Sequence, residues 1–182
     1  MANSAKKSKK VICSGCGTCC REPIVPVTHK DISRLSCFVN KAPGDFVRFY
    51  PTSLMDYDPQ SPMWVRLKSG KRAMGLKRVK NRCIFLDDTN RCSVYRVRPM
   101  TCRNFPYDVD LEENTENNIQ IGLNHIVKCN ARFCSDTDFS DILTLARQEM
   151  REDLQYHTLV KRWNSRRKRG DATEFLSFIE LE

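Results

Sequence analysis

Four cysteines lie within eight residues in the segment Cys13-Ser14-Gly15-Cys16-Gly17-Thr18-Cys19-Cys20, a CxxCxxCC array. A CxxC turn brings two sulfurs within reach of one metal, and here the turn is repeated at once. Gly15 and Gly17 are permissive residues that let such a loop fold back and direct its backbone amides toward thiolate sulfur. The segment predicts a metal-binding loop, with disulfides or buried thiols as the alternative.

The first three thiols have the spacing of the ferredoxin run, in which successive cysteines hold one iron–sulfur cluster. Cys20 breaks this likeness because it follows Cys19 directly, without the gap and the proline that ferredoxins have. We therefore expect the side chains of Cys19 and Cys20 to diverge, so that Cys20 serves another ligand position or another metal.

A second group of cysteines lies between residues 83 and 102. Two short strands joined by a turn at residues 87–90 would bring Cys83 and Cys92 together. Pro99 suits the first turn of a short helix that presents Cys102. Arg98 and Arg103 flank this thiol, and their permanently charged guanidinium groups are expected to offset excess negative charge on a bound metal-thiolate group.

Three further cysteines are more isolated. One of Cys129 and Cys134 is expected to complete the ligand set, and the sequence leaves open which one. Cys37 stands near the end of a predicted helix and far from other thiols, so we interpret it as a small buried apolar residue.

Composition indicates a reducing compartment. The chain has 182 residues, ten of them cysteine, and its first ten residues carry lysines without the apolar stretch of a signal peptide. Cytoplasmic thiols stay reduced, which favours metal binding over a disulfide framework. No apolar run approaches the twenty residues that a membrane span needs.

The formal net charge of +9 counts every thiol as neutral. It falls to +1 if eight cysteines ligate as thiolates, because ligation requires deprotonation. Much of the basic excess can therefore compensate a metal site, which argues against nucleic acid as the partner.

The chain divides into three predicted parts: a basic flexible tail at 1–12, a metal-binding domain at 13–163, and a basic linker with an amphipathic helix at 164–182. Within the domain we expect a helix over 29–37 with N-cap chemistry at Thr28, another over 43–51, and a hairpin of 63–67 with 73–79. Residues 119–123 should form a strand.

A long helix is predicted from Asp138 to about Trp163. The residues repeating along its apolar face are Phe139, Ile142, Leu143, Ala146, Met150, Leu154 and His157. The fold class predicted is α+β: a small, loop-rich metal-thiolate domain with short strands and a long C-terminal helix. The apolar face of the tail helix needs a cover, and an unknown protein partner or a second copy of the chain could supply it.

Together the two cysteine groups resemble the YkgJ-type CxxCxxCC family, which is described as zinc- or iron-chelating and is related to flagellin lysine N-methylases. The resemblance covers about residues 13–134. It rests on a CxxCxxCC loop followed by C-x-F-L, C-x-x-Y, R-P-x-x-C-R-x-F-P and a later cysteine. The matching residues here are Cys13, Cys16, Cys19, Cys20, Cys83, Phe85, Leu86, Cys92, Tyr95, Arg98, Pro99, Cys102, Arg103, Phe105, Pro106 and, for the later cysteine, Cys129.

The resemblance implies a metal site and leaves its use open. The sequence favours an iron–sulfur or metal-thiolate protein that transfers electrons, senses redox state or supports a partner. The alternatives are a zinc-stabilised interaction module and a metal-dependent protein lysine methyltransferase component. Against the last, the close glycine pair at 15 and 17 lies inside the metal loop, not after a strand where a nucleotide-binding turn belongs.

Overall fold

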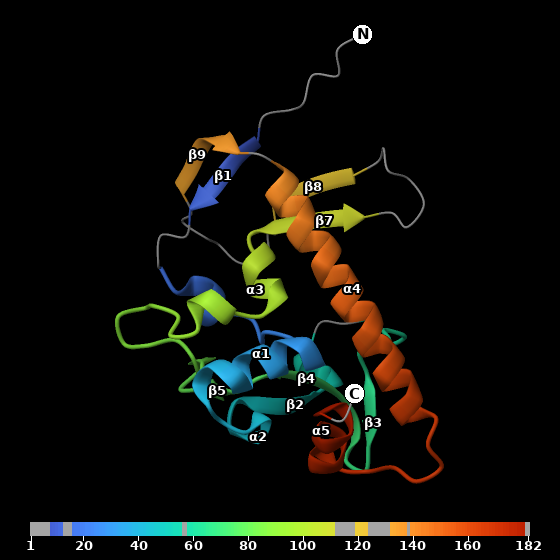
Figure 1. The fold of residues 1–182 in the computed structure, drawn as a ribbon. Helices are drawn as coiled ribbons and strands as arrows, with labels where there is room; N and C mark the ends of the chain where they lie inside the picture. The colour runs from blue at the N-terminus through green and yellow to red at the C-terminus, as the bar shows by residue number, and fades with distance from the viewer. Residues whose placement is uncertain are drawn as a thin grey trace.

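The computed structural model describes the backbone of residues 8–12, 16–55, 58–111, 119–123, 132–137 and 139–180 (Figure 1). Side chains are described within 16–55, 58–109, 121–122 and 140–180. The predicted α+β class is confirmed, with helices packed around small antiparallel sheets.

The strands and helices follow in a mixed order along the chain. They are β1 (Ser8–Ile12), η1 (Thr18–Cys20), α1 (His29–Val39), α2 (Pro43–Phe46), β2 (Val47–Pro51), η2 (Thr52–Leu54), β3 (Val65–Leu67), β4 (Gly70–Leu76), β5 (Arg78–Val79), β6 (Arg82–Cys83), η3 (Tyr95–Val97), α3 (Met100–Asn104), β7 (Tyr107–Leu111), β8 (Ile119–Leu123), β9 (Arg132–Thr137), α4 (Phe139–Asn164) and α5 (Ala172–Glu180).

A three-stranded antiparallel sheet, ordered β2-β4-β3, forms the centre of the fold. The predicted hairpin forms, but its second strand begins at Gly70 and not at residue 73. Val65 therefore lies opposite Arg72, and Leu67 lies opposite Gly70, whose φ is 103°. The helix expected over 43–51 is wrong beyond its first turn. Residues 47–51 instead form β2, because their aromatic and β-branched side chains suit a strand paired with β4.

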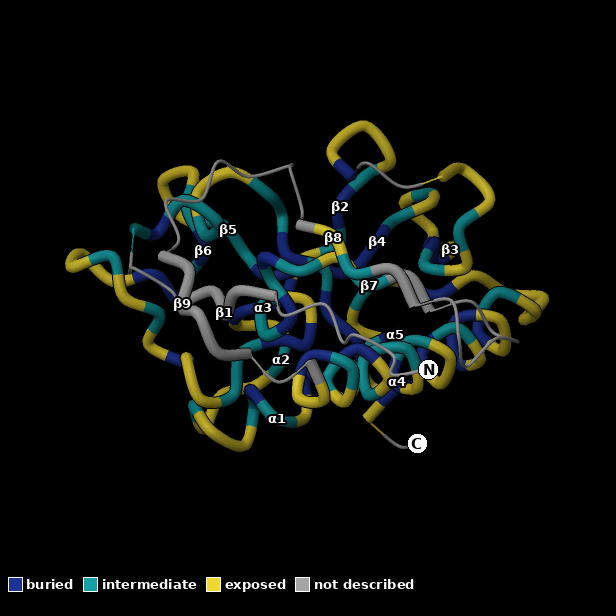
Figure 2. The backbone as a smooth tube through the Cα atoms, turned by 90° about the horizontal axis from the view of Figure 1, so that it is seen from above, coloured by how far each residue is buried: buried dark blue, intermediate teal, exposed yellow. Residues whose placement is uncertain are grey.

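Helix α1 begins as predicted, with a capping box at its N-terminus. The Asp31 N–H donates to Thr28 Oγ1 at 3.3 Å, and the Thr28 N–H donates to the Asp31 carboxylate at 3.0 Å. Ile32 and Leu35 face the core, where Leu35 is fully buried. Figure 2 shows buried positions along β2 and β4.

Helix α4 has the predicted length, and its predicted apolar face is confirmed at Ile142 and Ala146, which are buried, but not at Leu154. Leu154 is 47% exposed, whereas Tyr156 and Val160 are buried on the opposite side of the same turns. That inner face also carries Glu152, which is buried because Arg34 pairs with it at 2.7 Å. The pattern of apolar residues cannot predict this part of the buried face. The ion pair with Arg34 allows an acidic side chain to be buried there.

Helix α5 belongs to the core, which corrects the interpretation of 164–182 as an appended linker and helix. Phe175 is fully buried and meets the rings of Phe49, Tyr156 and Trp163 at centroid distances of 5.7, 6.5 and 5.2 Å. Its apolar face is covered by this chain itself. Gly170 precedes the helix, and a Cβ there would lie 2.5 Å from Trp163, so only glycine fits this approach.

The basic segment at the N-terminus is partly structured, which corrects the expectation of a flexible tail through residue 12. Strand β1 pairs antiparallel with β9, with Val11 opposite Phe133 and Lys10 opposite Cys134 (Figure 1). The predicted strand at 119–123 is confirmed as β8, and it pairs with β7. Among the described residues, no helix is long and apolar enough to cross a membrane.

Candidate metal centre

The CxxCxxCC loop turns sharply at Gly17, whose φ of 71° favours glycine. The N–H of Cys20 donates to the Gly17 carbonyl at 3.1 Å and closes the short helix η1. The Thr18 hydroxyl lies 3.3 Å from Cys16 Sγ. The expectation that Cys19 and Cys20 diverge is wrong, since their sulfurs are 3.9 Å apart. Both residues lie in the tight turn of η1, with side chains that lean toward one another.

The turn predicted at residues 87–90 forms, but Cys83 and Cys92 are not paired across it as predicted. Cys83 lies in β6 opposite Arg78, and Cys92 forms a bridge with Leu86. The N–H of the next residue, Ser93, donates to Phe85 O at 2.9 Å across the same hairpin. Pro99 is the N-cap of α3, which presents Cys102. Cys83 is buried, and Cys92 and Cys102 are partly buried.

These thiols interact electrostatically across the two groups. Contact with the Cys20 thiol, burial and the nearby Cys16 raise the pKa of Cys19 far above its usual range. Burial raises the pKa of Cys83 to about 11, and Cys92 and Cys19 contribute to this rise. Burial, then Cys83, Cys19 and Cys92, raises the pKa of Cys102 well above the usual value. Thiols from the loop, the hairpin and α3 thus lie near enough to one another to influence each other's protonation.

Not every predicted ligand can be placed there. Cys13 and Cys129 lie outside the described residues, and of Cys134 only the backbone, in β9, is described. Within the described ranges, no three His, Cys, Asp or Glu side chains are already arranged to hold one metal ion. The ligand set therefore stays a prediction.

Arg98 and Arg103 bind backbone around Cys102. Arg98 Nε donates to Cys102 O at 3.0 Å, and the guanidinium lies 3.9 Å from the centre of the Tyr95 ring. Arg103 Nε donates to Arg98 O at 3.0 Å. These contacts fix the turn that carries Cys102, while the predicted offset of thiolate charge stays a prediction.

The arginine that acts on a described thiol is Arg78. Burial dominates the pKa of Cys83 and raises it, while the Phe85 N–H and the positive charge of Arg78 lower it. Sequence reasoning missed Arg78, because Lys77, Lys80 and Arg82 surround it and nothing in the pattern distinguishes it from them.

Cys37 is exposed on α1, which corrects the expectation of a buried thiol. It follows Leu35 by two positions, and this offset turns it away from the helix face that enters the core.

We expect Cys37→Ala to leave metal content unchanged and to alter the free energy of unfolding by less than about 0.5 kcal/mol, as for other surface substitutions. Metal analysis and urea unfolding check this, and a lower metal-to-protein ratio in a folded variant would make Cys37 a ligand.

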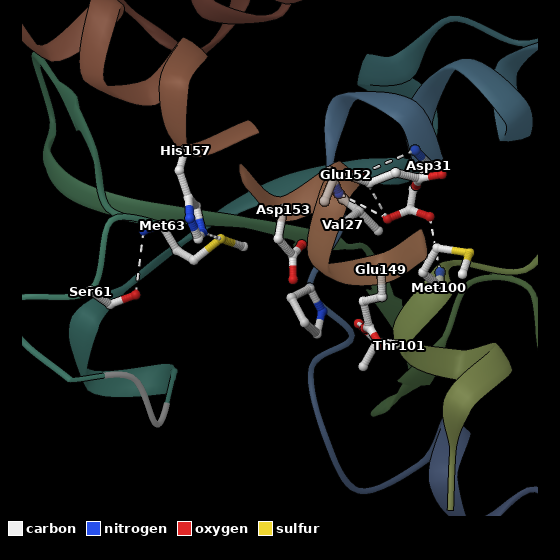
Figure 3. Close-up of a pocket in the computed structure, with 12 residues that line it drawn as sticks. Val27, Asp31, Ser61, Met63, Met100, Thr101, Glu149, Glu152, Asp153 and His157 are labelled. Atoms are coloured by element: carbon white, nitrogen blue, oxygen red, sulfur yellow. Dashed lines mark hydrogen bonds between the residues drawn. The ribbon is translucent and has the colours of Figure 1, made fainter. Parts of the chain in front are cut away.

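A cavity of about 280 Å³ lies beside α4, with no described thiol in its lining, and Figure 3 shows the side chains around it. Its acidic lining comes from Asp31, Glu149, Glu152 and Asp153. The Arg34 guanidinium bonds both Asp31 and Glu152. His157 Nε2 lies 3.2 Å from Met63 Sδ at one side of the cavity (Figure 3).

Asp153 makes stability depend on pH. Burial, together with Glu149, Asp31 and Glu152, raises its pKa to about 7. In the unfolded chain the Asp153 carboxyl has a pKa of about 3.9. Between this pH and the folded pKa the folded chain holds a proton that the unfolded chain has lost, so stability falls as pH rises through that range.

We therefore expect Asp153→Asn to stabilise the protein by about 2 kcal/mol at pH 8 and to have no effect at pH 3, where both states hold the proton. Urea unfolding at the two pH values checks this. Asp141→Asn, at an exposed position on the same helix, is the control. An Asp153→Asn effect that is equal at both pH values would contradict the assignment.

The donor chemistry fits a soft metal or an iron–sulfur cluster. Neutral thiols with raised pKa values are poor partners for one another, whereas a bound cation stabilises their thiolate forms and releases the protons. The described thiols Cys16, Cys19, Cys20, Cys83, Cys92 and Cys102 are the residues that would hold such a group. Thiolates select zinc and iron–sulfur clusters alike.

Comparison with known proteins supports this fit. The model of the CxxCxxCC family, described as "Putative zinc- or iron-chelating domain", matches residues 12–135. The chain is 33% identical over 100 residues to "Uncharacterized protein MJ0661" of Methanocaldococcus jannaschii, a match that covers 54% of this chain and 46% of that protein. No solved structure matches.

The matched region contains both cysteine groups and every thiol of the candidate centre, so metal binding is the shared property that the family description supports. Because the match extends over well more than half of the chain, this protein belongs to the CxxCxxCC family of zinc- or iron-chelating domains.

Proposed function

We propose that this protein binds an iron–sulfur cluster through its clustered thiolates and serves in electron transfer, redox sensing or the support of a partner. The observation that carries the proposal is the coupling of Cys19, Cys83, Cys92 and Cys102, which come from three separate segments. The proposed ligands are these four with Cys13, Cys16 and Cys20, completed by Cys129 or Cys134.

The number and spacing of the thiols favour iron. Structural zinc takes four ligands, usually as two separated pairs, whereas three thiolates at CxxCxxC spacing are typical of cluster ligands. Six thiols are described in and around the centre, which is more than one zinc ion uses. The proposed compartment is the cytoplasm, where such thiols stay reduced.

The chain's own residues would shape the environment of the bound group. When bound, the cluster supplies one-electron transfer at a potential that solvent access and hydrogen bonds to sulfur adjust. Cys83 lies among the buried side chains of Phe85, Leu86 and Val94, which keep water from one side of the site. The loop side is more open, since Cys16, Cys19 and Cys20 are only partly buried.

The redox role is tested by titrating oxygen-free protein with dithionite and then with an oxidant. We expect visible absorption to bleach and to return, with a paramagnetic signal in one of the two states. Absorption that does not respond to either reagent would contradict electron transfer.

Zinc is the second candidate, and one observation favours it. The thiols that raise the pKa of Cys102 are Cys83, Cys19 and Cys92, and with Cys102 they make four, the number that a tetrahedral zinc ion takes. In that case the thiolates would serve the fold of an interaction module. Colourless protein with one zinc per chain would favour this candidate.

A further inference from the structure

The backbone hydrogen bonds of residues 16–22, the described end of the CxxCxxCC loop and the turn after it, are local. The N–H groups of Cys20, Arg21 and Glu22 donate to the carbonyls of Gly17 and Thr18 in the same turn. Backbone pairing with the central sheet begins later, where Leu76 donates to Val25 O at 2.9 Å and Val27 donates to Met74 O at 3.3 Å. Within the described residues, side chains link this part of the loop to the second cysteine group.

Arg21 provides the first of these links. Its Nη1 donates to Cys16 O at 3.2 Å, inside the loop. Its Nη2 donates to the side-chain oxygen of Asn90, in the turn between Cys83 and Cys92. One guanidinium thus joins the backbone of a proposed ligand to the hairpin that carries two others.

Arg78 provides a second link from the other side. Its Nη1 donates to Glu22 O at 3.0 Å and to Pro23 O at 2.8 Å. Its Nη2 donates to Arg21 O and to Asn81 O, the latter in the turn that leads into β6 and Cys83. Arg78 itself lies opposite Cys83 in the β5–β6 pair. Its guanidinium therefore holds the end of the metal loop beside the strand of Cys83.

We propose that Arg21 and Arg78 are positioning residues that lock the CxxCxxCC loop onto the second cysteine hairpin, so that the two groups of thiols face one metal centre. The proposal rests on the proposed function in one respect, that both groups serve the same centre. It does not depend on whether that centre holds iron or zinc.

The packing of Gly17 supports this role for Arg21. A Cβ at Gly17 would lie 2.6 Å from Arg21 Nη1, 3.4 Å from the Asn90 Cβ and 3.5 Å from a Leu86 methyl carbon. The loop therefore approaches the hairpin closely beneath the guanidinium. Position 17 favours glycine for two reasons: its φ is 71°, and Arg21 occupies the space that a side chain would need.

The chemistry of the links requires arginine. Donation to four carbonyls from one planar group uses the forked N–H geometry of guanidinium, whereas a lysine ammonium is a point charge with three donors. Arg78→Lys keeps the positive charge near Cys83 and loses that geometry. It therefore separates a positioning role from a purely electrostatic one.

The test measures two rates in Arg78→Gln, Arg78→Lys and Asn90→Gly. One is the rate at which a chromophoric chelator removes the bound metal, and the other is the rate at which a disulfide reagent modifies the thiols of the metal-free, reduced protein. Asn90→Gly removes the acceptor of Arg21 and tolerates the φ of 62° at this position. Arg82→Gln is the matched control, because Arg82 lies in the same strand pair and its guanidinium contacts Asp88 at 2.6 Å.

We expect metal release and thiol modification to be on the order of tenfold faster in all three variants, the scale seen when groups that orient metal ligands are lost, and unchanged in the control. Thermal unfolding shows whether each variant folds. Arg78→Lys at wild-type rates, or Arg82→Gln as fast as Arg78→Gln, would overturn the proposal.

If the Arg78 variants fail to fold, Asn90→Gly decides, and unchanged rates in that variant would overturn the role of Arg21. The identity of the metal in the wild-type protein separately decides the proposed function. The thiol rates need no metal, so failure of one proposal is distinguishable from failure of the other.

Discussion

Truncation after Asn164 is expected to unfold this protein, because it removes a helix that completes the core. Phe175 of α5 is fully buried between Phe49, Tyr156 and Trp163, and Ile179 is 5% exposed. Losing both side chains exposes apolar surface on the sheet and on α4. Stabilities of whole domains are only about 5–15 kcal/mol, so such a loss is comparable with the total.

The single substitution Phe175→Ala makes this expectation quantitative. Removing a buried aromatic ring and leaving a cavity lowers the free energy of unfolding by about 3–5 kcal/mol. Phe175 has no exposed surface, so the full effect is expected. Urea unfolding followed by circular dichroism gives the free-energy change. Phe38→Ala is the control, because Phe38 is 50% exposed and should change stability by less than about 0.5 kcal/mol. A Phe175→Ala protein as stable as the Phe38→Ala control would show that α5 does not belong to the core.

Replacing Cys102 is expected to have the largest effect on metal binding. Its thiol couples to Cys83, Cys19 and Cys92, so it links the loop to the hairpin. Loss of groups that only orient ligands costs about 10 to 100-fold in metal affinity, and loss of a shared ligand should cost more. We expect Cys102→Ala to be isolated with less than a tenth of the wild-type metal when it is made under the same conditions.

The control for Cys102→Ala is Cys37→Ala, which removes an exposed thiol and keeps the candidate centre intact. Circular dichroism of the metal-free proteins shows whether either substitution disrupts the fold by itself. Wild-type metal content in a folded Cys102→Ala protein would exclude Cys102 from the centre.

Local signals in the sequence predicted the elements that depend on neighbouring residues. Thr28 and Asp31 mark the start of α1 through a capping box, and Gly70 marks the turn between β3 and β4. Residues 47–51 were the exception among short elements, since their pairing with β4 outweighed the helical spacing of Phe46, Val47 and Tyr50.

Long-range packing could not be predicted in the same way. Nothing near residues 8–12 indicates that β9, more than a hundred residues later, pairs with them. The buried face of α4 includes Glu152 because Arg34 of α1 neutralises it, and a single-helix pattern cannot show that partner. The cover for α5 likewise includes Phe49, which lies far from it in sequence.

In the candidate site, too, local spacing could be predicted from the sequence and long-range contacts could not. Cysteine spacing predicts the thiol ligands, and in the structure Cys83, Cys19 and Cys92 contribute to the raised pKa of Cys102. Arg21 and Arg78 act through backbone carbonyls, and such contacts leave no spacing pattern in a chain with 31 lysine and arginine residues. The positions of these two arginines became visible only with the fold.

The most direct test of the central claim is the iron, zinc and acid-labile sulfide content per chain of protein that is produced and purified without oxygen. An iron–sulfur centre predicts brown protein with broad absorption at roughly 400 nm, and with iron and sulfide in comparable amounts. Colourless protein that carries stoichiometric zinc and no sulfide under those conditions would contradict the claim.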